Sequence, residues 1–330
     1  MNIAVLSGKG GAGKTFVAVN LAAAAGQATY IDCDVEEPNG RLFWKPEQVR
    51  TTPVVTLLPE FDNTKCTGCR KCVDFCRFHA LLYIRETPMV FPEVCHSCGG
   101  CLLVCPQEAI REVPRQIGVV EEGTHGNIHV VTGILNPGEA SGIPIIREAL
   151  KKAEGLTILD CPPGSACSVM ESILRADYCL LTAEPTAFGF HNFRMVYELA
   201  SLLGKPAGVV INKEDQPYSP LEAFCEARAI PILAHIPYRE DYGRLAAAGK
   251  ILAEESPEAK AIFLSLLETL IKSARADGER FWHKRKFGKS GNTGCISHFS
   301  NCTIGAKDSP AAVDDLFSVS LWEKIGGSRP

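Results

Sequence analysis

Eight of the fifteen cysteines in this 330-residue chain lie between positions 66 and 105, in two runs of identical spacing. The first run is Cys66-x2-Cys69-x2-Cys72-x3-Cys76, and the second is Cys95-x2-Cys98-x2-Cys101-x3-Cys105. Each cysteine of the first run has a counterpart 29 positions later, which indicates a duplicated half-module. Thiolates gathered in this way point to metal or cluster ligation, or to redox chemistry.

Zinc and disulfides are the alternative interpretations of these cysteines. Zinc sites use pairs of ligands separated by about twelve or more residues, which differs from two runs of four. The N-terminus lacks the charged region and cleavage site of a signal peptide, so we expect a cytoplasmic chain. Disulfides do not persist in that reducing compartment.

The cysteine spacing resembles that of bacterial ferredoxins with two 4Fe-4S clusters, in which the fourth cysteine of each run ligates the other cluster. The resemblance implies one cluster on Cys66, Cys69, Cys72 and Cys105, and a second cluster on Cys95, Cys98, Cys101 and Cys76. One departure concerns the proline that follows the fourth cysteine. It is present as Pro106 but replaced by Arg77 in the first run, which bears on the surroundings of one cluster.

A glycine-rich loop follows the apolar run at residues 2–6. Its residues are Gly8, Lys9, Gly10, Gly11, Ala12, Gly13, Lys14 and Thr15, which fit the motif G-x-x-x-x-G-K-T. The backbone N–H groups of such a loop bind phosphates together with the N-terminus of the following helix. We therefore expect Lys14 to contact the β- and γ-phosphates and the Thr15 hydroxyl to bind Mg²⁺.

Lys9, directly after the first glycine, makes the loop similar to that of the MinD/ParA/Mrp and nitrogenase-iron-protein class of ATPases. Residues 31–34, 157–164 and 209–213 resemble later motifs of this class, and the best match is to MinD-superfamily ATPases with an inserted ferredoxin domain. The resemblance implies that Lys9 reaches the phosphates of a partner subunit. ATP would then join two copies of the chain into a homodimer.

The same resemblance implies roles for five further residues. Asp34 would orient the attacking water, and Asp160 would hold Mg²⁺ through a water. Gly164 would sense the γ-phosphate through its N–H, while Asn212 and the Pro237 loop would contact adenine. Phosphoryl transfer needs this kind of positioning and charge neutralisation and little covalent chemistry. The alternative for each aspartate is a cap or turn residue at a strand end.

The hydrophobic pattern predicts the elements that position these residues. Apolar runs predict buried strands at residues 2–6, 28–33, 53–58, 128–133, 156–160, 178–183, 207–212 and 231–236. Helix-like stretches lie at 14–25, 143–154, 188–203 and 219–229, and an amphipathic stretch at 257–275 predicts a final helix. This alternation is typical of an α/β fold with a doubly wound, mostly parallel sheet.

We expect a discontinuous P-loop ATPase domain over 1–60 and 114–278. An α+β domain of the bacterial ferredoxin type is expected at 61–113 and a mobile tail at 279–330. Cys167 lies seven residues after Asp160, where nitrogenase-iron-protein-like ATPases place an interface cluster ligand. No second cysteine stands in the matching context, and the alternative is a small buried residue. Cys295 and Cys302, in the tail, receive no role.

Three functions of different class fit an ATPase that carries a ferredoxin. ATP hydrolysis gates electron transfer to a redox partner protein, or the protein loads iron–sulfur or metal cofactors onto a carrier, or it is a ParA/MinD-type positioning ATPase whose clusters sense redox state. Permanent cluster ligands favour electron transfer, since a donated cluster needs labile ligands. The net charge of −4, the pI of about 6.1 and a weakly amphipathic C-terminus argue against nucleic acid and membrane partners.

Overall fold

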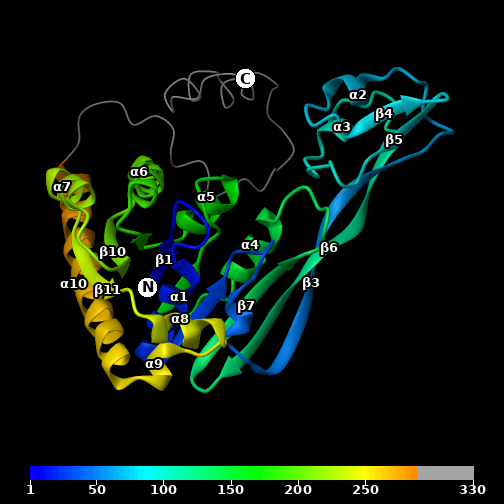
Figure 1. The fold of residues 1–330 in the computed structure, drawn as a ribbon. Helices are drawn as coiled ribbons and strands as arrows, with labels where there is room; N and C mark the ends of the chain where they lie inside the picture. Colours follow the sequence, from blue (N-terminus) through cyan, green and yellow to red (C-terminus); the bar gives the residue numbers. More distant parts are fainter. Residues whose placement is uncertain (288–330) are drawn as a thin grey trace. The chain divides into compact units, whose positions relative to one another are not determined.

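The computed structural model describes residues 1–287, and it separates a compact unit of Met1–Arg280 from a second unit that begins at Phe281. The first unit contains a nine-stranded sheet of strand order β11-β10-β9-β1-β8-β2-β7-β6-β3 (Figure 1). From β11 to β7 every neighbouring pair is parallel, which confirms the expected α/β fold with a mostly parallel sheet.

The parallel strands and the helices between them lie close to the ranges that the sequence predicts. The strands are β1 (Asn2–Leu6), β2 (Ala28–Asp32), β7 (Ile128–Leu135), β8 (Thr157–Asp160), β9 (Tyr178–Ala183), β10 (Ala207–Glu214) and β11 (Ile232–Pro237). The helices are α1 (Lys14–Ala25), α4 (Ile143–Leu150), α5 (Cys167–Leu174), α6 (Ala187–Leu202), α7 (Ser219–Ala227), α8 (Glu240–Ala247), α9 (Leu252–Glu255) and α10 (Pro257–Phe287), with a 3-10 turn at Gly40–Leu42. Helix α10 extends beyond residue 275, into the segment expected to be a tail; residues 288–330 lie outside the described residues.

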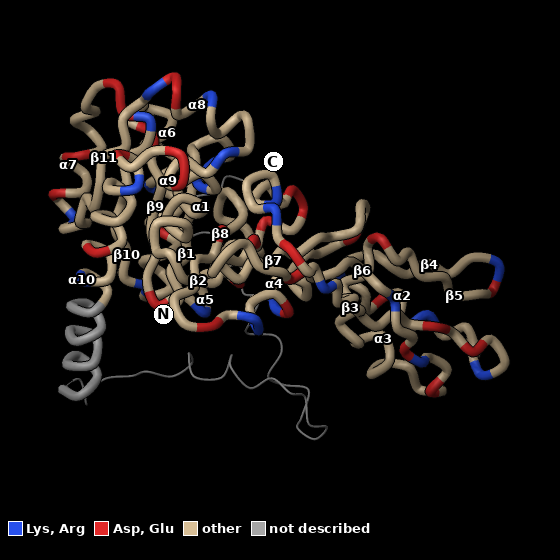
Figure 2. The backbone as a smooth tube through the Cα atoms, turned by 90° about the horizontal axis from the view of Figure 1, so that it is seen from below, with Lys and Arg blue, Asp and Glu red and all other residues tan. Residues whose placement is uncertain are grey.

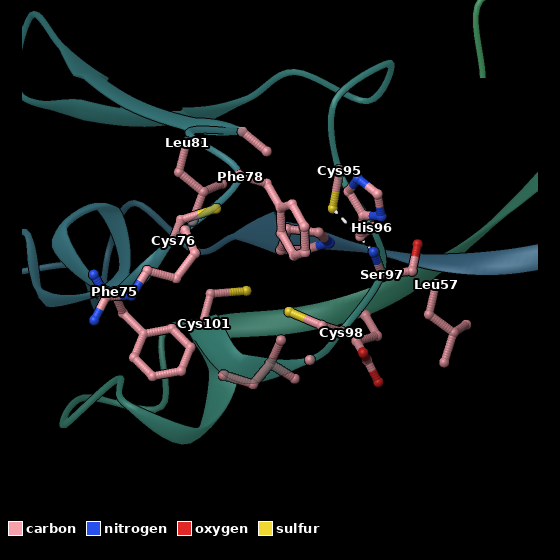
Figure 3. A pocket seen from close by; sticks show the side chains of 16 residues that line it. Leu57, Phe75, Cys76, Phe78, Leu81, Cys95, His96, Ser97, Cys98 and Cys101 are labelled. Atoms are coloured by element: carbon pink, nitrogen blue, oxygen red, sulfur yellow. Dashed lines mark hydrogen bonds between the residues drawn. The ribbon is translucent and has the colours of Figure 1, made fainter. Parts of the chain in front are cut away.

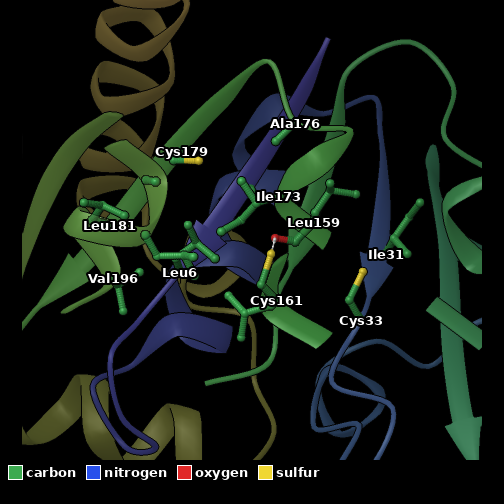
Figure 4. Close-up of a cluster of buried hydrophobic side chains, with 14 of the residues drawn as sticks. Leu6, Ile31, Cys33, Leu159, Cys161, Ile173, Ala176, Cys179, Leu181 and Val196 are labelled. Atoms are coloured by element: carbon green, nitrogen blue, oxygen red, sulfur yellow. Dashed lines mark hydrogen bonds between the residues drawn. The ribbon is translucent and has the colours of Figure 1, made fainter. Parts of the chain in front are cut away.

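Each face of the sheet carries its own core, because successive side chains of a strand point to opposite faces. Ala4, Leu6 and Leu159 pack with α4, α5, α6 and α7 on one face. Ile3 and Ile158 pack with α1, α8, α9 and α10 on the other. Four buried cysteines belong to the first core: Cys33, Cys161 and Cys179, which Figure 4 labels, and Cys225. Helices on both faces bury the central strands completely, which fixes the strand ends that carry the polar residues.

One edge of the sheet differs from the expectation. Strand β6 (Ile110–His125) is antiparallel to β7, and β3 (Glu47–Phe61) is antiparallel to β6. The hydrophobic pattern predicts a strand only at 53–58 in this region and none at 110–125. The outer parts of β3 and β6 pair only with each other within the sheet and extend from it together (Figure 1). We call the paired residues 55–61 and 110–117 the arm.

The arm carries the cysteine-rich segment, residues 62–109, which we call the insert. It contains the short helices α2 (Lys71–Phe75) and α3 (Gly100–Leu103) and a hairpin of β4 (Leu81–Ile84) and β5 (Thr87–Val90). Its two halves repeat the same backbone geometry at a separation of 29 residues. The left-handed φ values of 72°, 60° and 52° at Gly68, Arg70 and His79 recur as 53°, 70° and 48° at Ser97, Gly99 and Glu108.

Equivalent backbone hydrogen bonds close the two halves of the insert. The N–H of Asp62 donates to the carbonyl of Ala109, and the N–H of Phe91 donates to the carbonyl of Ala80, both at 2.8 Å. Asp62 and Phe91, like Ala80 and Ala109, are equivalent positions of the repeat. The duplication in the sequence therefore folds with approximate two-fold symmetry.

Segments of Lys and Arg and segments of Asp and Glu are interspersed over the fold, including the insert (Figure 2). This distribution agrees with the net charge of −4, which provides no bulk basic field. Among residues 1–287, no helix combines the length and the apolar character needed to cross a bilayer.

Candidate functional site

The glycine-rich loop lies between the end of β1 and the start of α1, as its motif requires. Gly11 and Gly13 have φ values of 83° and 88°, which L side chains rarely adopt. A Cβ added to Gly8 would lie 2.0 Å from the carbonyl oxygen of Asn192, and one added to Gly13 would lie 2.1 Å from Asn212 Nδ2. Glycine is therefore required here both for backbone conformation and for close packing against α6 and β10.

Lys14 meets the carboxylates at the ends of two neighbouring strands. Its Nζ lies 2.5 Å from Asp160 Oδ1 and 3.9 Å from Asp34 Oδ2, and the lysine is buried. Nζ also donates to the Thr15 hydroxyl at 3.4 Å. The second oxygen of Asp160 accepts a 2.8 Å hydrogen bond from Tyr30 Oη. The structure thus brings together the four residues expected at the phosphates and Mg²⁺.

Asp32 adds a further carboxylate to this group. It is completely buried, and its two oxygens accept hydrogen bonds from the backbone N–H groups of Asp34 and Gly40. Burial raises the pKa of Asp32 well above its usual range, and repulsion by Asp160 raises it further, while Lys14 acts in the opposite direction. The raised pKa means that Asp32 holds its proton more strongly than a free aspartate does, so the group of three carboxyl groups around Lys14 carries less negative charge than three ionised carboxylates would.

Asp34 and Lys14 respond to each other's charge. The pKa of Asp34 is raised to about 6, and burial is the largest cause. The charge of Lys14 acts to lower this pKa, and the charge of Asp160 acts to raise it. Burial alone would lower the pKa of Lys14, but the carboxylates of Asp160, Asp32 and Asp34 outweigh burial and raise it. Lys14 therefore carries its charge at neutral pH.

Lys9 does not point toward the acidic group. Its Nζ lies 2.6 Å from Glu184 Oε2 and stacks over the Phe188 ring at 4.9 Å from the centroid. The other oxygen of Glu184 is 2.8 Å from Lys213 Nζ, which also donates to the carbonyl of Gly11. Burial alone would raise the pKa of Glu184, but Lys213 and Lys9 outweigh it and lower the pKa. Glu184 thus holds the loop lysine within its own chain.

The remaining expected nucleotide contacts lie around the same loop. Asn212 Nδ2 donates to the carbonyl of Ala12 at 2.9 Å, and Pro237 pairs with Glu214 at the end of the neighbouring strand. The Gly164 N–H donates to the carbonyl of Ser7 at 2.9 Å, which links the segment after β8 to the glycine loop. Gly164 has a φ of 88° and open space where a side chain would begin.

The eight cysteines of the two runs sort into two separate cavities. One cavity is lined by Cys76, Cys95, Cys98 and Cys101, and the other by Cys66, Cys69, Cys72 and Cys105. These are the two sets that the ferredoxin resemblance implies, including the exchange of the fourth cysteine between runs. In the first cavity the four sulfur atoms point toward its interior, beside the stacked rings of Phe78 and His96 (Figure 3).

Backbone N–H groups also point at these sulfurs. The N–H of Ser97 donates to Cys95 Sγ at 3.5 Å, and the N–H of Ala109 donates to Cys105 Sγ at 3.4 Å. Burial raises the pKa of the Cys101 thiol to about 11, and the neighbouring Cys98 and Cys95 add to this. Within residues 1–287, no three His, Cys, Asp or Glu side chains converge closely enough to hold a single metal ion.

Four residues of the nucleotide site had no assigned role in the sequence reading: Tyr30, Asp32, Glu184 and Lys213. Asp32 stands two positions before Asp34, and that spacing at a strand end could have indicated it. Lys213 is the last residue of the 209–213 stretch that resembles a motif of the class, whereas Tyr30 and Glu184 are far in sequence from the groups that they contact. Cys167, at the first position of α5, is exposed, so the alternative of a small buried residue is wrong.

A phosphate-binding loop between the first strand and helix, with carboxylates at the ends of adjacent parallel strands, defines a P-loop nucleotide-binding protein. The family model "CobQ/CobB/MinD/ParA nucleotide binding domain" matches residues 3–252. The chain belongs to this family.

Comparisons with known proteins are consistent with this family assignment. Two uncharacterized proteins of Methanocaldococcus jannaschii are 28% and 27% identical to this chain over 221 residues, which is 65% and 64% of this chain and 78% and 80% of theirs. The cell division ATPase MinD of Pyrococcus furiosus has a TM-score of 0.51 at 20% identity, covering 82% of this chain and 98% of its own. MinD of Pyrococcus horikoshii, solved with Mg-ADP, has a TM-score of 0.52 at 20% identity over 81% and 94% of the two chains. At such identity the solved structures establish a shared fold.

Proposed function

We propose that this protein is a Mg²⁺-dependent ATPase that couples ATP binding and hydrolysis to electron transfer through two 4Fe-4S clusters. The observation that carries the proposal is the sorting of eight thiols into two cavities, in the crossed sets typical of a two-cluster ferredoxin. These cavities belong to the same chain as a complete phosphate-binding loop. The combination favours an ATP-gated redox protein over either activity alone.

ATP hydrolysis is assigned to the group around Lys14. The N–H groups of the glycine loop and the N-terminus of α1 bind the phosphates, and Lys14 neutralises the β- and γ-phosphates. Thr15 and Asp160 hold Mg²⁺, and Asp34 orients the attacking water. Lys14 is paired with Asp160. A Mg²⁺ ion held by Thr15 and Asp160 would supply positive charge beside that carboxylate, and Lys14 would then be free to bind phosphate.

The insert would hold the clusters through its eight thiolates. The cavities provide four sulfur ligands each, and N–H groups directed at Cys95 and Cys105 stabilise the negative charge on thiolate sulfur. A bound 4Fe-4S cluster supplies one-electron storage and transfer. Because each thiolate binds a different iron, the four sulfurs surround a cavity and need not converge on one point.

The proposed assembly is an ATP-dependent homodimer that serves a redox partner protein. Lys9 is partly exposed at the mouth of the loop and is held by Glu184 in a single chain. Reaching the phosphates of a second subunit requires Lys9 to leave Glu184, so ATP and Glu184 compete for the same ammonium group. Size-exclusion chromatography with and without Mg-ATP tests this association.

Anaerobic purification followed by iron, sulfide and zinc analysis tests the redox half of the proposal. We expect about eight irons per chain, and fewer than about five with zinc present would overturn the ferredoxin assignment. Electron paramagnetic resonance of the reduced protein should then show cluster potentials that change when Mg-ATP is added. Potentials that are insensitive to nucleotide would move the assignment to cofactor assembly, or to the MinD-type positioning role that the shared fold allows.

A further inference from the structure

The arm leaves the sheet at a defined point. Strands β6 and β7 pair as far as Gly118 and Leu135, and beyond this point β6 continues with β3 alone. There the β3–β6 register shifts: Val54 faces Gly118 and Val55 faces Gln116, so Ile117 is the extra residue of a β-bulge. Bulges bend a strand and mark places where a ribbon changes direction. The direction of the arm is therefore set by whatever holds residues 115–117.

An ion pair holds the arm at this bend. The two guanidinium nitrogens of Arg115, on β6, each lie 2.9 Å from one carboxylate oxygen of Glu139. Glu139 belongs to the loop of residues 136–142 between β7 and α4, and its side chain is only 6% exposed. Such a bidentate ion pair, which we call the fork, fixes the orientation of the two side chains as well as their distance. The same loop donates the Asn136 N–H to the carbonyl of Ile117 at 2.9 Å.

Arg115 also contacts the segment that leads into the cysteine loop of the second run. Its guanidinium lies 4.0 Å from Glu93, two residues before Cys95. Arg115 therefore contacts both the loop of residues 136–142 and the segment next to Cys95.

The other end of the loop reaches the nucleotide site through Val35, the residue after Asp34. The Leu135 N–H donates to the Val35 carbonyl at 2.8 Å. The buried Val35 side chain fits between Gly133 and Gly142: a Cβ added to these glycines would lie 2.6 Å and 2.3 Å from it. Both ends of the loop that carries Glu139 thus contact Val35. A shift of the Asp34 segment must move this loop or open a gap in close packing.

We propose that Glu139 and Arg115 are positioning residues that transmit the nucleotide state of the Asp34–Val35 segment to the arm and to the loop of Cys95. The inference rests on the proposed function, because it assigns the contact through which ATP acts on one of the two cluster sites. Binding of Mg-ATP at Asp34 shifts Val35, the loop 136–142 follows, and the fork at Glu139 turns the arm.

Hydrogen–deuterium exchange of the full-length protein tests this route without relying on activity. In the wild type, a non-hydrolysable ATP analogue with Mg²⁺ should change amide exchange in the loop 136–142 and in the arm by about fivefold or more. In Glu139→Gln the loop should still respond and the arm should not. Arg115→Lys, which keeps the charge but loses the fork, should give the same loss.

Arg111→Gln is the matched control, since Arg111 pairs with Glu60 inside the arm and both side chains are exposed. It should retain the response of the arm. An arm that responds equally in Glu139→Gln, or one that does not respond in a wild type that binds the analogue, would overturn the inference. A wild type that binds no analogue or no iron contradicts the proposed function instead, so the two failures are distinguishable.

Discussion

The nucleotide site and the insert place their reactive side chains in opposite ways. Asp32, Asp160 and Lys14 lie in a buried group at the ends of strands that are covered on both faces. The cysteines of the insert are exposed or half-buried, and few apolar side chains are buried around them, namely Ala80, Leu81 and Ala109. One site is positioned by a hydrophobic core, and the other has little core of its own.

This contrast indicates what each region needs in order to fold. A segment of fewer than about 70 residues rarely buries enough apolar surface for independent stability and usually requires metal or disulfide cross-links. On the proposed function, the insert depends on the two proposed clusters for a fixed structure, while the nucleotide domain does not. The following predictions test this difference.

The largest expected effect is on ATP hydrolysis in Lys14→Ala. The variant loses the cation that neutralises the phosphates, and we expect kcat to fall by about 100-fold or more. Steady-state phosphate release measures this loss. Iron content should remain that of the wild type, because the insert does not contact Lys14. Wild-type turnover in this variant would sink the nucleotide assignment.

Removing a cluster ligand should act on the insert alone. Cys101→Ser leaves one cavity with three thiols, and we expect about four irons per chain to be lost and amide exchange in residues 62–109 to approach that of an unfolded chain. Exchange in β1, β8 and α1 should stay unchanged. Cys167→Ser, which alters an exposed cysteine of α5, serves as the control with full iron content. A protected insert in iron-free protein would contradict the proposed dependence.

The pH dependence of stability should reveal the buried carboxylates. The folded-state pKa of Asp34 is about 6, above its unfolded value, so the native state binds this proton more tightly than the unfolded state. The stabilisation from the protonated form is therefore present at low pH and is lost as pH rises through about 6. Relative to Asp34→Asn, the wild type should therefore lose thermal stability as pH rises through about 6. Parallel melting curves of the two proteins between pH 4 and 8 measure the difference.

The smallest effect concerns Tyr30→Phe. It removes the hydroxyl that donates to Asp160 Oδ2 and leaves a buried carboxylate oxygen without that donor. We expect the free energy of unfolding to fall by about 1–3 kcal/mol. Urea denaturation measures the change, and an unchanged midpoint would show that the hydrogen bond contributes nothing net.

The central sheet could be predicted because its strands are buried on both faces and read as apolar runs. Helix α1 begins and ends where the sequence pattern places it, at Lys14 and Ala25. The arm was missed for the opposite reason. Strand β6 is largely exposed in its first half, where pairs of polar residues separate the apolar ones and Pro114 interrupts the pattern, so it presents neither an apolar run nor a regular alternation. Its pairing with β3 spans about fifty intervening residues and leaves no local signal.

The same distinction applies to the sites. Lys14, Thr15 and the eight cysteines belong to local motifs whose spacing follows from ligand geometry. The structure places the Thr15 hydroxyl 3.4 Å from Lys14 Nζ and sorts the cysteines into two separate cavities. The side chains that contact Lys9 and Asp160 do not belong to such local motifs. Glu184 and Tyr30 contact residues that are distant in sequence, so tertiary structure was needed to identify them.

The chain enters and leaves the insert at one place, where Phe61 faces Ile110 across the arm. A two-residue turn could replace residues 62–109 and leave every strand of the large sheet in its register. The cysteine-rich insert is thus a separable module, and its removal would require no change in the core of the nucleotide-binding domain.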